Sequence, residues 1–347
     1  MNKAMNKAMN KAMNKAMKSA KKKHSLRGPL SLMGLVIIAG LIIAGLTHSY
    51  VITDWLKLQN YTPPTNIIQL ADQTTMTDKA RHMLYINHPV VEDKAVFNGS
   101  CDKFGEQTIV LGCYQGVQRG IHILSVSDER LQGVEQVTIA HEMLHAAYDR
   151  LGSQQKIRLN SMLQAFADNQ LKDARITALL KNYEKTEPGQ QLNEMHSIFG
   201  TEISSLPVPL EQYYSQYFTN RKEITTFAAQ YQTAFTSRQT AIEQYDSLLK
   251  SLGLEIKDNT AQLVNRQSAI ENRGRELDSF RTNGNIQQYN SGIESYNASI
   301  DTYNALLANT KHQIDEYNQV VAKRNVIATQ TQELQKAIES SSLPGSK

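Results

Sequence analysis

Apolar residues recur at every seventh position in the last third of this chain, a pattern that few folds accommodate. The first series comprises Ile242, Leu249, Ile256, Leu263, Ile270 and Leu277. A second series, from Tyr289 to Val321, places Tyr, Ile, Leu and Val at alternating steps of four and three residues, apart from one gap. Such heptads are typical of coiled-coil helices, each of which has one apolar seam that it cannot bury alone. The break at residues 282–285, Thr-Asn-Gly-Asn, predicts that the two helices fold back on each other as an antiparallel hairpin.

Three polar residues, Asn259, Arg266 and Arg273, interrupt the partner positions of the first series. They disfavour the alternative of one long helix that dimerises in parallel, because identical polar residues would then face each other. We therefore expect residues 220–340 alone to be helical and monomeric, and cysteines placed at 277 and 293 to crosslink within one chain. At about 1.5 Å per residue, each arm would be roughly 80 Å long. The second arm is poor in charge and carries four Tyr-Asn pairs, which indicates a surface for a protein partner.

A stretch without charged residues, from Gly28 to Thr53, follows a strongly basic segment. Residues 1–29 carry nine Lys and Arg side chains and no acid; since the whole chain has a net charge of +4, the remainder carries −5. This distribution excludes a general attraction of the main body to nucleic acid, so no nucleic-acid partner is expected. About 20 apolar residues span a bilayer as a helix, and positively charged flanks stay in the cytosol. The pattern predicts a single-pass protein of the cell membrane with a cytoplasmic N-terminus and an extracytoplasmic main body; a cleaved signal peptide is the alternative.

Composition divides the chain into six expected segments. They are a basic, low-complexity cytoplasmic tail of Met-Asn-Lys-Ala repeats (1–29), a transmembrane signal anchor (30–52), a linker (53–65), an α+β domain (66–218), the coiled-coil hairpin (219–340) and a disordered tail (341–347). Within the α+β domain, helices are predicted at 75–85, 133–150 and 154–169, and strands at 108–114 and 120–126. A domain of about 150 residues is large enough for one hydrophobic core.

The motif His141-Glu142-Met143-Leu144-His145 lies in the predicted helix 133–150. Histidines four positions apart project from the same helical face, so both imidazoles can ligate one Zn²⁺ ion while the glutamate reaches a water molecule beside it. The flanking residues 138–140 and 146–147 are uncharged and small or apolar, as a buried active-site helix requires. The alternative is an amphipathic helix with two incidental histidines.

This motif resembles that of the zincin metallopeptidases. Tyr148 and Leu151 occupy the positions where the metzincin branch has a glycine and its third ligand, so that branch is disfavoured. Residues 193–197, Asn-Glu-Met-His-Ser, are similar to the Asn-Glu-x-x-Ser-Asp segment of the thermolysin-like gluzincins. This resemblance covers residues 66–218 and implies a gluzincin-like site in which Glu194 is the third metal ligand.

One position departs from the gluzincin pattern. Ile198 stands where that family has the aspartate that orients a ligand histidine, so another group must take this role. Asp149, Glu202 or a backbone carbonyl are the candidates. Glu202 and His196 also remain as alternative third ligands, and a solvated helix carboxylate remains as the alternative for Glu194.

The resemblance also implies a reaction. His141, His145 and Glu194 would hold Zn²⁺, which lowers the pKa of a water molecule in its fourth coordination position. Glu142 would act as the general base that takes the proton of this water and then delivers it to the leaving amine. The implied substrate is a peptide or a protein.

The oxyanion formed in this reaction needs a hydrogen-bond donor. Thermolysin-type enzymes use a distant histidine, whereas here the tyrosines at 213, 214 and 217 are the candidates, with Tyr214 as the first choice. Their alternative role is aromatic packing in the core. By resemblance to zincins, one strand of the predicted sheet, next to the active-site helix, would be the edge along which an extended substrate docks.

Cys101 and Cys113 are the only cysteines of the chain. Twelve positions apart and expected outside the cytoplasm, they predict a disulfide; two buried free thiols are the alternative. A metal role is disfavoured, because two isolated thiols at this spacing do not form a ligand set.

Taken together, these features predict a membrane-anchored zinc metallopeptidase. Its α+β zincin-like catalytic domain would be preceded by one transmembrane helix and followed by the long antiparallel hairpin. It would hydrolyse peptide bonds outside the cytoplasm. The alternative, from another functional class, is a catalytically silent surface scaffold or adaptor that acts through its coiled coil.

Overall fold

The computed structural model describes residues 7–15, 49–101, 111–116, 120–186 and 189–338. The chain divides into two units, Met1–Thr62 and Pro63–Lys347. In the first unit, residues 7–15 are helical and helix α3 spans Ser49–Leu58. Residues 30–48 of the predicted transmembrane anchor and the predicted tail 341–347 lie outside the described residues. Within the described ranges, no helix combines the length and the apolar character that crossing a bilayer requires.

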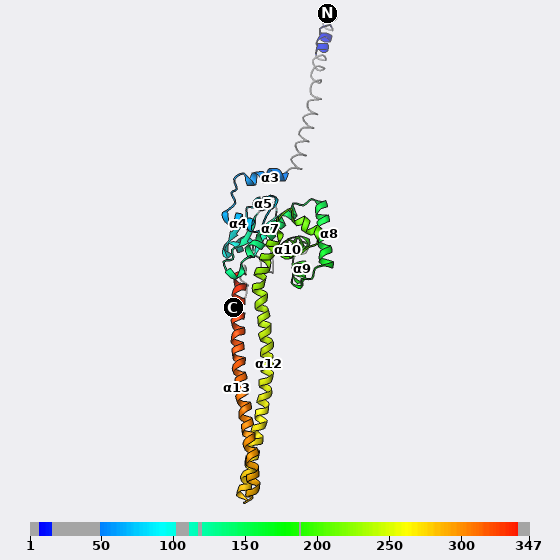
Figure 1. Cartoon of the computed structure of the whole chain (residues 1–347). Coiled ribbons are helices and arrows are strands. Elements are labelled where there is room, and N and C mark those ends of the chain that lie inside the picture. The colour runs from blue at the N-terminus through cyan, green and yellow to red at the C-terminus, as the bar shows by residue number, and fades with distance from the viewer. Residues whose placement is uncertain (1–6, 16–48, 102–110, 117–119, 187–188, 339–347) are drawn as a thin grey trace. The chain divides into compact units, whose positions relative to one another are not determined.

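The second unit is a mostly helical α+β fold with a small sheet, and its first part precedes the hairpin (Figure 1). Its described strands are β1 (Val90–Glu92), β2 (Gly112–Tyr114) and β3 (Ile121–Leu124). The helices of this part are α4 (Thr65–Gln73), α5 (Asp78–Tyr85), α6 (Lys94–Cys101), the 3₁₀ helix η2 (Glu129–Leu131), α7 (Val134–Asp149), α8 (Ser153–Asn169), α9 (Ala174–Thr186), α10 (Gln191–Glu202) and α11 (Val208–Tyr214). The predicted α+β class is confirmed.

One predicted boundary is wrong for a local reason. The helix predicted from residue 75 begins at Asp78, because Thr75 has a left-handed backbone with φ of +53°. Thr77 then caps the helix, since its hydroxyl accepts a hydrogen bond from the backbone N–H of Ala80.

β3 is the central strand of the described sheet. β1 pairs with β3 in parallel, with Val91 opposite Ile123, and β2 pairs with β3 antiparallel, with Cys113 opposite His122. β2 and β3 are shorter than the strands predicted at 108–114 and 120–126, and residues 108–110 lie outside the described residues. Because side chains alternate along a strand, Ile121 and Ile123 point to one face, where they are fully buried in the core with α7.

Helix α7 is the central element of this core. Apolar residues surround it on most sides, and α4, α5, α10, β2 and β3 all pack against it. Small side chains such as Ala140 and Ala147 allow the neighbouring elements to approach closely. The His-Glu-x-x-His motif therefore lies on a rigid helix inside the protein.

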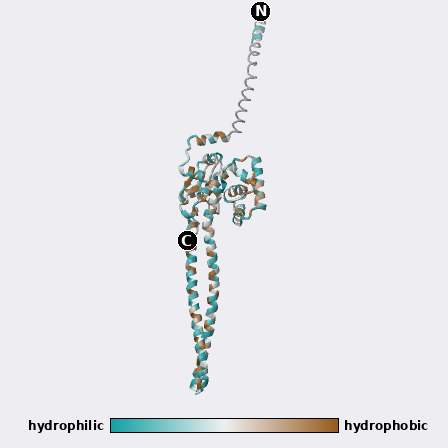
Figure 2. Cartoon of the chain, viewed as in Figure 1, coloured by the Kyte–Doolittle hydropathy of each residue, from teal (hydrophilic) through white to brown (hydrophobic). Residues whose placement is uncertain are grey.

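The predicted antiparallel hairpin is confirmed. Helices α12 (Arg221–Thr282) and α13 (Ile286–Ile338) lie side by side (Figure 1), and hydrophilic residues intersperse with apolar ones along both arms (Figure 2). The turn between them uses Gly284, whose φ of +76° is accessible to glycine without strain. Asn285 donates its backbone N–H to the carbonyl of Phe280 and so closes the first arm.

The register of the hairpin depends on pairing large residues with glycine. A Cβ atom at Gly292 would lie 2.5 Å from the Leu277 side chain, and one at Gly274 would lie 3.2 Å from the Tyr296 hydroxyl. Asn259, one of the three polar residues that interrupt the first series, has a partner on the other arm. Its side-chain amide donates a 2.7 Å hydrogen bond to Gln313. Tyr296 packs at Gly274 and Tyr317 lies next to Gly253 within the same chain, so these two tyrosines do not need a parallel dimer to cover them.

Both ends of the hairpin return to the α+β core. At the start of α12, Phe227 lies so close to Gly133 that a Cβ atom there would be 2.6 Å from the Phe227 carbonyl oxygen. At the end of α13, Leu334 and Ile338 pack against Val134, the first residue of α7. The hairpin is therefore continuous with the hydrophobic core at its base.

Cysteine crosslinking provides a test of this register. Leu277→Cys combined with Gly292→Cys should form a disulfide within one chain on mild oxidation, because the Leu277 side chain lies directly against Gly292. Leu277→Cys combined with Asn290→Cys is the control, since Asn290 is exposed. Non-reducing electrophoresis distinguishes the outcomes: a fast monomer band supports the hairpin, whereas crosslinks only between chains would contradict it.

Candidate metal centre

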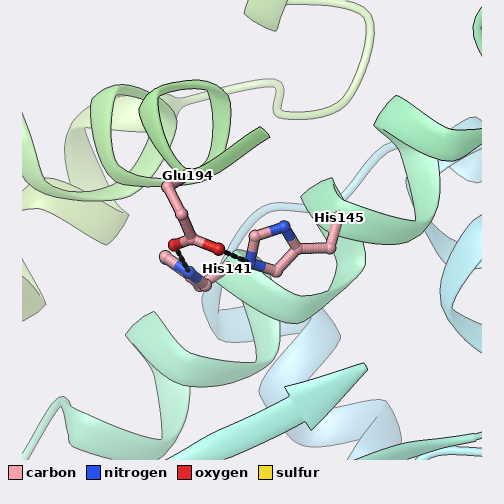
Figure 3. A group of neighbouring side chains, drawn as sticks. All are labelled: His141, His145 and Glu194. Carbon is pink, nitrogen blue, oxygen red and sulfur yellow. Dashed lines mark ion pairs between the residues drawn. The ribbon is translucent and has the colours of Figure 1, made fainter. Parts of the chain in front are cut away.

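His141 and His145 lie one turn apart on the same face of α7 (Figure 3). Their rings meet edge to face, with centroids 4.7 Å apart. His145 and Glu142 are buried, and His141 is partly exposed. The predicted helix thus presents two imidazoles to one point in a largely enclosed site.

Helix α10 brings Glu194 to the two histidines. Its Oε2 atom lies 3.6 Å from Nε2 of His141, and its Oε1 atom lies 3.4 Å from Nε2 of His145 (Figure 3). The close approach of the helices depends on Gly200, because a Cβ atom there would lie 2.5 Å from the Leu144 side chain of α7. A glycine near the C-terminal end of α10 therefore decides how closely the Glu194 carboxylate approaches α7.

The three side chains fit the ligand set of a metal ion. One donor atom from each of His141, His145 and Glu194 lies within 4.8 Å of the others, and this is the one such group in the part of the chain that the structure describes. A tetrahedral zinc ion bound at about 2.0–2.1 Å would set its ligand atoms roughly 3.3–3.4 Å apart. The two nitrogen–oxygen distances to Glu194, 3.4 and 3.6 Å, are close to that spacing.

The charges of the group are strongly coupled. Burial alone would lower the pKa of His141, but the interaction with Glu194 and the negative charge of Glu142 raise this pKa to about 9. Burial lowers the pKa of His145. Burial would raise the pKa of Glu194, yet the neighbouring His145 and His141 lower it. Without a metal, a proton on His141 therefore balances the buried carboxylate, and a metal ion would replace this proton.

Ser197 orients His145, a role that the sequence prediction gave to other residues. The Ser197 hydroxyl lies 3.2 Å from Nδ1 of His145, which leaves Nε2 directed at Glu194. Asp149 acts on the pKa of His145 through its charge, as a minor contribution. Ser197 follows Glu194 by three positions, so both project from one face of α10. This spacing was the sequence signal from which the contact of Ser197 with His145 could have been predicted.

The two alternative third ligands lie elsewhere. The carboxylate of Glu202 accepts hydrogen bonds from Arg175 at 2.7 Å and Gln232 at 2.8 Å, and Arg175 also neutralises its charge. His196 is fully buried, its Nε2 atom lies 3.0 Å from the Tyr213 hydroxyl, and burial lowers its pKa well below the ordinary value. Neither residue belongs to the metal-binding group, so Glu194 is the third member.

Tyr214 packs in the aromatic core, which was the alternative to its predicted role as oxyanion donor. It is fully buried, its ring stacks on His196, and its hydroxyl donates a 2.7 Å hydrogen bond to the backbone carbonyl of His196. Tyr213 and Tyr217 surround the same imidazole. The hydroxyl of Tyr214 is already engaged, so we do not assign the oxyanion-donor role to it.

Strand β2 lies directly against the glutamate of the motif. A Cβ atom at Gly112 would be 2.9 Å from the Glu142 carboxylate and 2.5 Å from Thr138, so only glycine permits this approach. The next residue, Cys113, forms the predicted disulfide with Cys101 at the end of α6, which is confirmed. The disulfide thus holds a three-residue strand in contact with Glu142, a relation that the sequence alone did not indicate.

The packing of Gly200 leads to a stability prediction. Gly200→Ala should lower the free energy of unfolding by roughly 1–3 kcal/mol, because the added methyl group forces α10 away from Leu144. It should also weaken metal binding. Gly99→Ala in α6 is the matched control, since its Cβ would meet no atom within 4 Å and alanine favours a helix. Denaturant unfolding and metal titration check both; equal effects of the two substitutions would contradict the proposed close contact.

Comparisons with protein-family models, with curated proteins and with solved structures find no match to this chain. The geometry of His141, His145 and Glu194 is therefore the observation from which a function can be argued.

Proposed function

We propose that this protein is a membrane-anchored, zinc-dependent metallopeptidase of gluzincin-like type that hydrolyses peptide bonds outside the cytoplasm. The observation that carries the proposal is the convergence of His141, His145 and Glu194 from two helices, with Glu142 between the two histidines in sequence. Two neutral imidazoles and one carboxylate are the protein ligand set found in many catalytic zinc sites.

The residues of the chain have distinct roles in this proposal. A zinc ion held by the triad would supply Lewis-acid chemistry, polarising a water molecule and the substrate carbonyl. Glu142 accepts the proton of the attacking water and passes it to the leaving amine. Ser197 keeps His145 in the orientation that directs Nε2 to the site.

The small sheet supports a peptide as the substrate. β3 pairs with a strand on each side, so a peptide cannot add to it. β2 is a terminal strand of the described sheet, and its Gly112 lies against Glu142. An extended peptide that adds to β2 by backbone hydrogen bonds would pass close to the glutamate. We therefore place the substrate along β2.

The sequence supports the proposed location. Nine positive charges precede the uncharged stretch Gly28–Thr53, and Lys57 is the first basic residue after it. This asymmetry favours a cytoplasmic N-terminus and an extracytoplasmic second unit. The Cys101–Cys113 disulfide agrees with that location, because disulfides persist in oxidising compartments.

Glu142→Gln is the experiment that tests the proposed activity. The variant should keep one zinc ion per chain, since Glu142 is outside the ligand group, and should lose at least about 100-fold in peptide hydrolysis because it lacks the base. Glu184→Gln, at an exposed position of α9, is the matched control and should retain both zinc and activity. Hydrolysis of a denatured protein substrate and metal analysis are the measurements. Wild-type protein that binds zinc but shows no hydrolysis would favour the silent scaffold.

A further inference from the structure

Helix α3 has an unusual distribution of exposed residues. At 100° per residue, Val51, Ile52, Trp55, Leu56 and Leu58 fall on one side of the helix, and Tyr50, Thr53, Asp54 and Lys57 fall on the other. Among residues 50–58, Asp54 on the polar side is the only buried one, at 6% exposure. Val51 is 64% exposed, Ile52 54%, Trp55 60% and Leu56 57%.

This arrangement is the reverse of that in a water-soluble domain. A helix at the surface of such a domain directs its apolar side to the core and its charges to water. In α3 four large apolar side chains, Val51, Ile52, Trp55 and Leu56, form one exposed patch instead. A contiguous exposed patch of this kind marks a surface that something else covers.

The position of α3 in the chain indicates the bilayer as that partner. The helix begins within the last residues of the uncharged stretch Gly28–Thr53, whose apolar core Leu30–Leu46 has the composition of a membrane span. Unlike Leu30–Leu46, the helix is apolar on one side only, because Asp54 and Lys57 occupy the other. One-sided apolar character favours lying along the interface, and Trp and Tyr are the residues enriched at that depth.

We propose that α3 lies flat in the interfacial region of the bilayer, with Val51, Ile52, Trp55 and Leu56 in contact with lipid acyl chains and with Asp54 and Lys57 directed away from them. The proposal rests on the membrane anchoring in the proposed function. The position of α3 itself does not depend on zinc or on hydrolysis, whereas its consequence for the substrate does.

An interfacial α3 would also restrict the substrate. Only six residues separate Leu58 from Thr65, the first residue of α4, so the connection can extend over roughly 25 Å at most. Two of these six are prolines, Pro63 and Pro64, which stiffen the connection. The second unit would therefore stay close to the membrane, and membrane proteins with exposed segments near the bilayer would be the class of substrate it meets.

Trp55 is the only tryptophan of the chain, so its fluorescence reports on α3 alone. We would reconstitute the full chain in phosphatidylcholine vesicles that carry bromine either near the top of the acyl chains or near the bilayer centre. The expected result is blue-shifted Trp55 emission that the shallow bromines quench at least twofold more strongly than the deep ones. Iodide in the water should quench it weakly.

A pair of matched variants makes the test specific for the apolar side. Leu56→Lys, on the apolar side, should shift the emission to the red and reduce quenching by shallow bromines at least twofold. Thr53→Lys, which adds the same charge on the polar side, should leave both unchanged. Equal responses of the two variants would overturn the proposal.

The remaining outcomes separate the inference from the anchoring on which it rests. Strongest quenching by the deep bromines would make α3 part of a span, and strong quenching by iodide would place Trp55 in water. Blue-shifted emission that no bromine quenches would mean that protein, such as a second copy, covers the patch. Each of these overturns the interfacial α3 while the protein still floats with the vesicles. A protein that fails to float would contradict the membrane anchoring itself.

Discussion

Glu194→Ala should bind zinc at least about 100-fold more weakly than the wild-type protein, because it removes one of the three side chains of the metal-binding group. Glu202→Gln is the matched control on the same helix. Its amide oxygen can still accept hydrogen bonds from Arg175 and Gln232, so the fold and the zinc affinity should persist. Competition with a chromogenic chelator measures both affinities. Full zinc occupancy in Glu194→Ala would remove this residue from the ligand set.

The same substitution should change the metal-free protein in a defined direction. Glu194 helps to raise the pKa of His141 from 6.5 to about 9, so the ion pair between protonated His141 and Glu194 stabilises the fold. The contribution of this His141 proton is fully present below pH 6.5. This stabilisation is lost as the pH rises through 9. In Glu194→Ala the pKa of His141 should fall, because the variant lacks the hydrogen bond and the negative charge of Glu194. Histidine NMR titration of the metal-free proteins measures this shift. Zinc affinity of the wild type should rise with pH, because His141 must lose its proton to bind the metal.

Arg221→Met should lower the free energy of unfolding by roughly 2–4 kcal/mol, because the buried guanidinium connects three elements. Arg221 forms an ion pair with Glu211 of α11 and donates hydrogen bonds to the carbonyls of Ile203 and Phe199, at 2.5 and 3.4 Å. Methionine fills a similar volume but leaves these carbonyls without their donor. Urea denaturation measures the loss.

Arg281→Met at the tip of the hairpin is the control for Arg221→Met. Its ion pair with Asp278 is exposed, and such pairs contribute about 0–1 kcal/mol. The two proteins should also differ in their pH dependence. Arg221 helps to lower the pKa of Glu211 against the effect of burial, so the wild type loses this part of its stability as the pH falls through that lowered pKa. Arg221→Met should not show this loss; an unchanged acid profile would contradict the role of the pair.

Several features were predictable because they depend on short-range periodicity. Histidines at i and i+4 share a helical face in any α-helix, so His141 and His145 converge whatever surrounds them. Heptads specify an apolar seam, and Gly284 between two such helices specifies the reversal. The Cys101–Cys113 disulfide follows from two cysteines close in sequence.

Other features depend on contacts between distant segments, and only the tertiary structure decided them. Glu194, Glu202 and His196 all lie on α10, and the Asn-Glu-x-x-Ser pattern favoured Glu194 without excluding the other two. The packing of Gly200 on Leu144 brings Glu194 to the histidines. Tyr214 belongs to the core because α11 packs its ring on His196, eighteen positions away. A helix determines by itself which side chains share a face, but which face meets which neighbour depends on the shape and volume of the whole core.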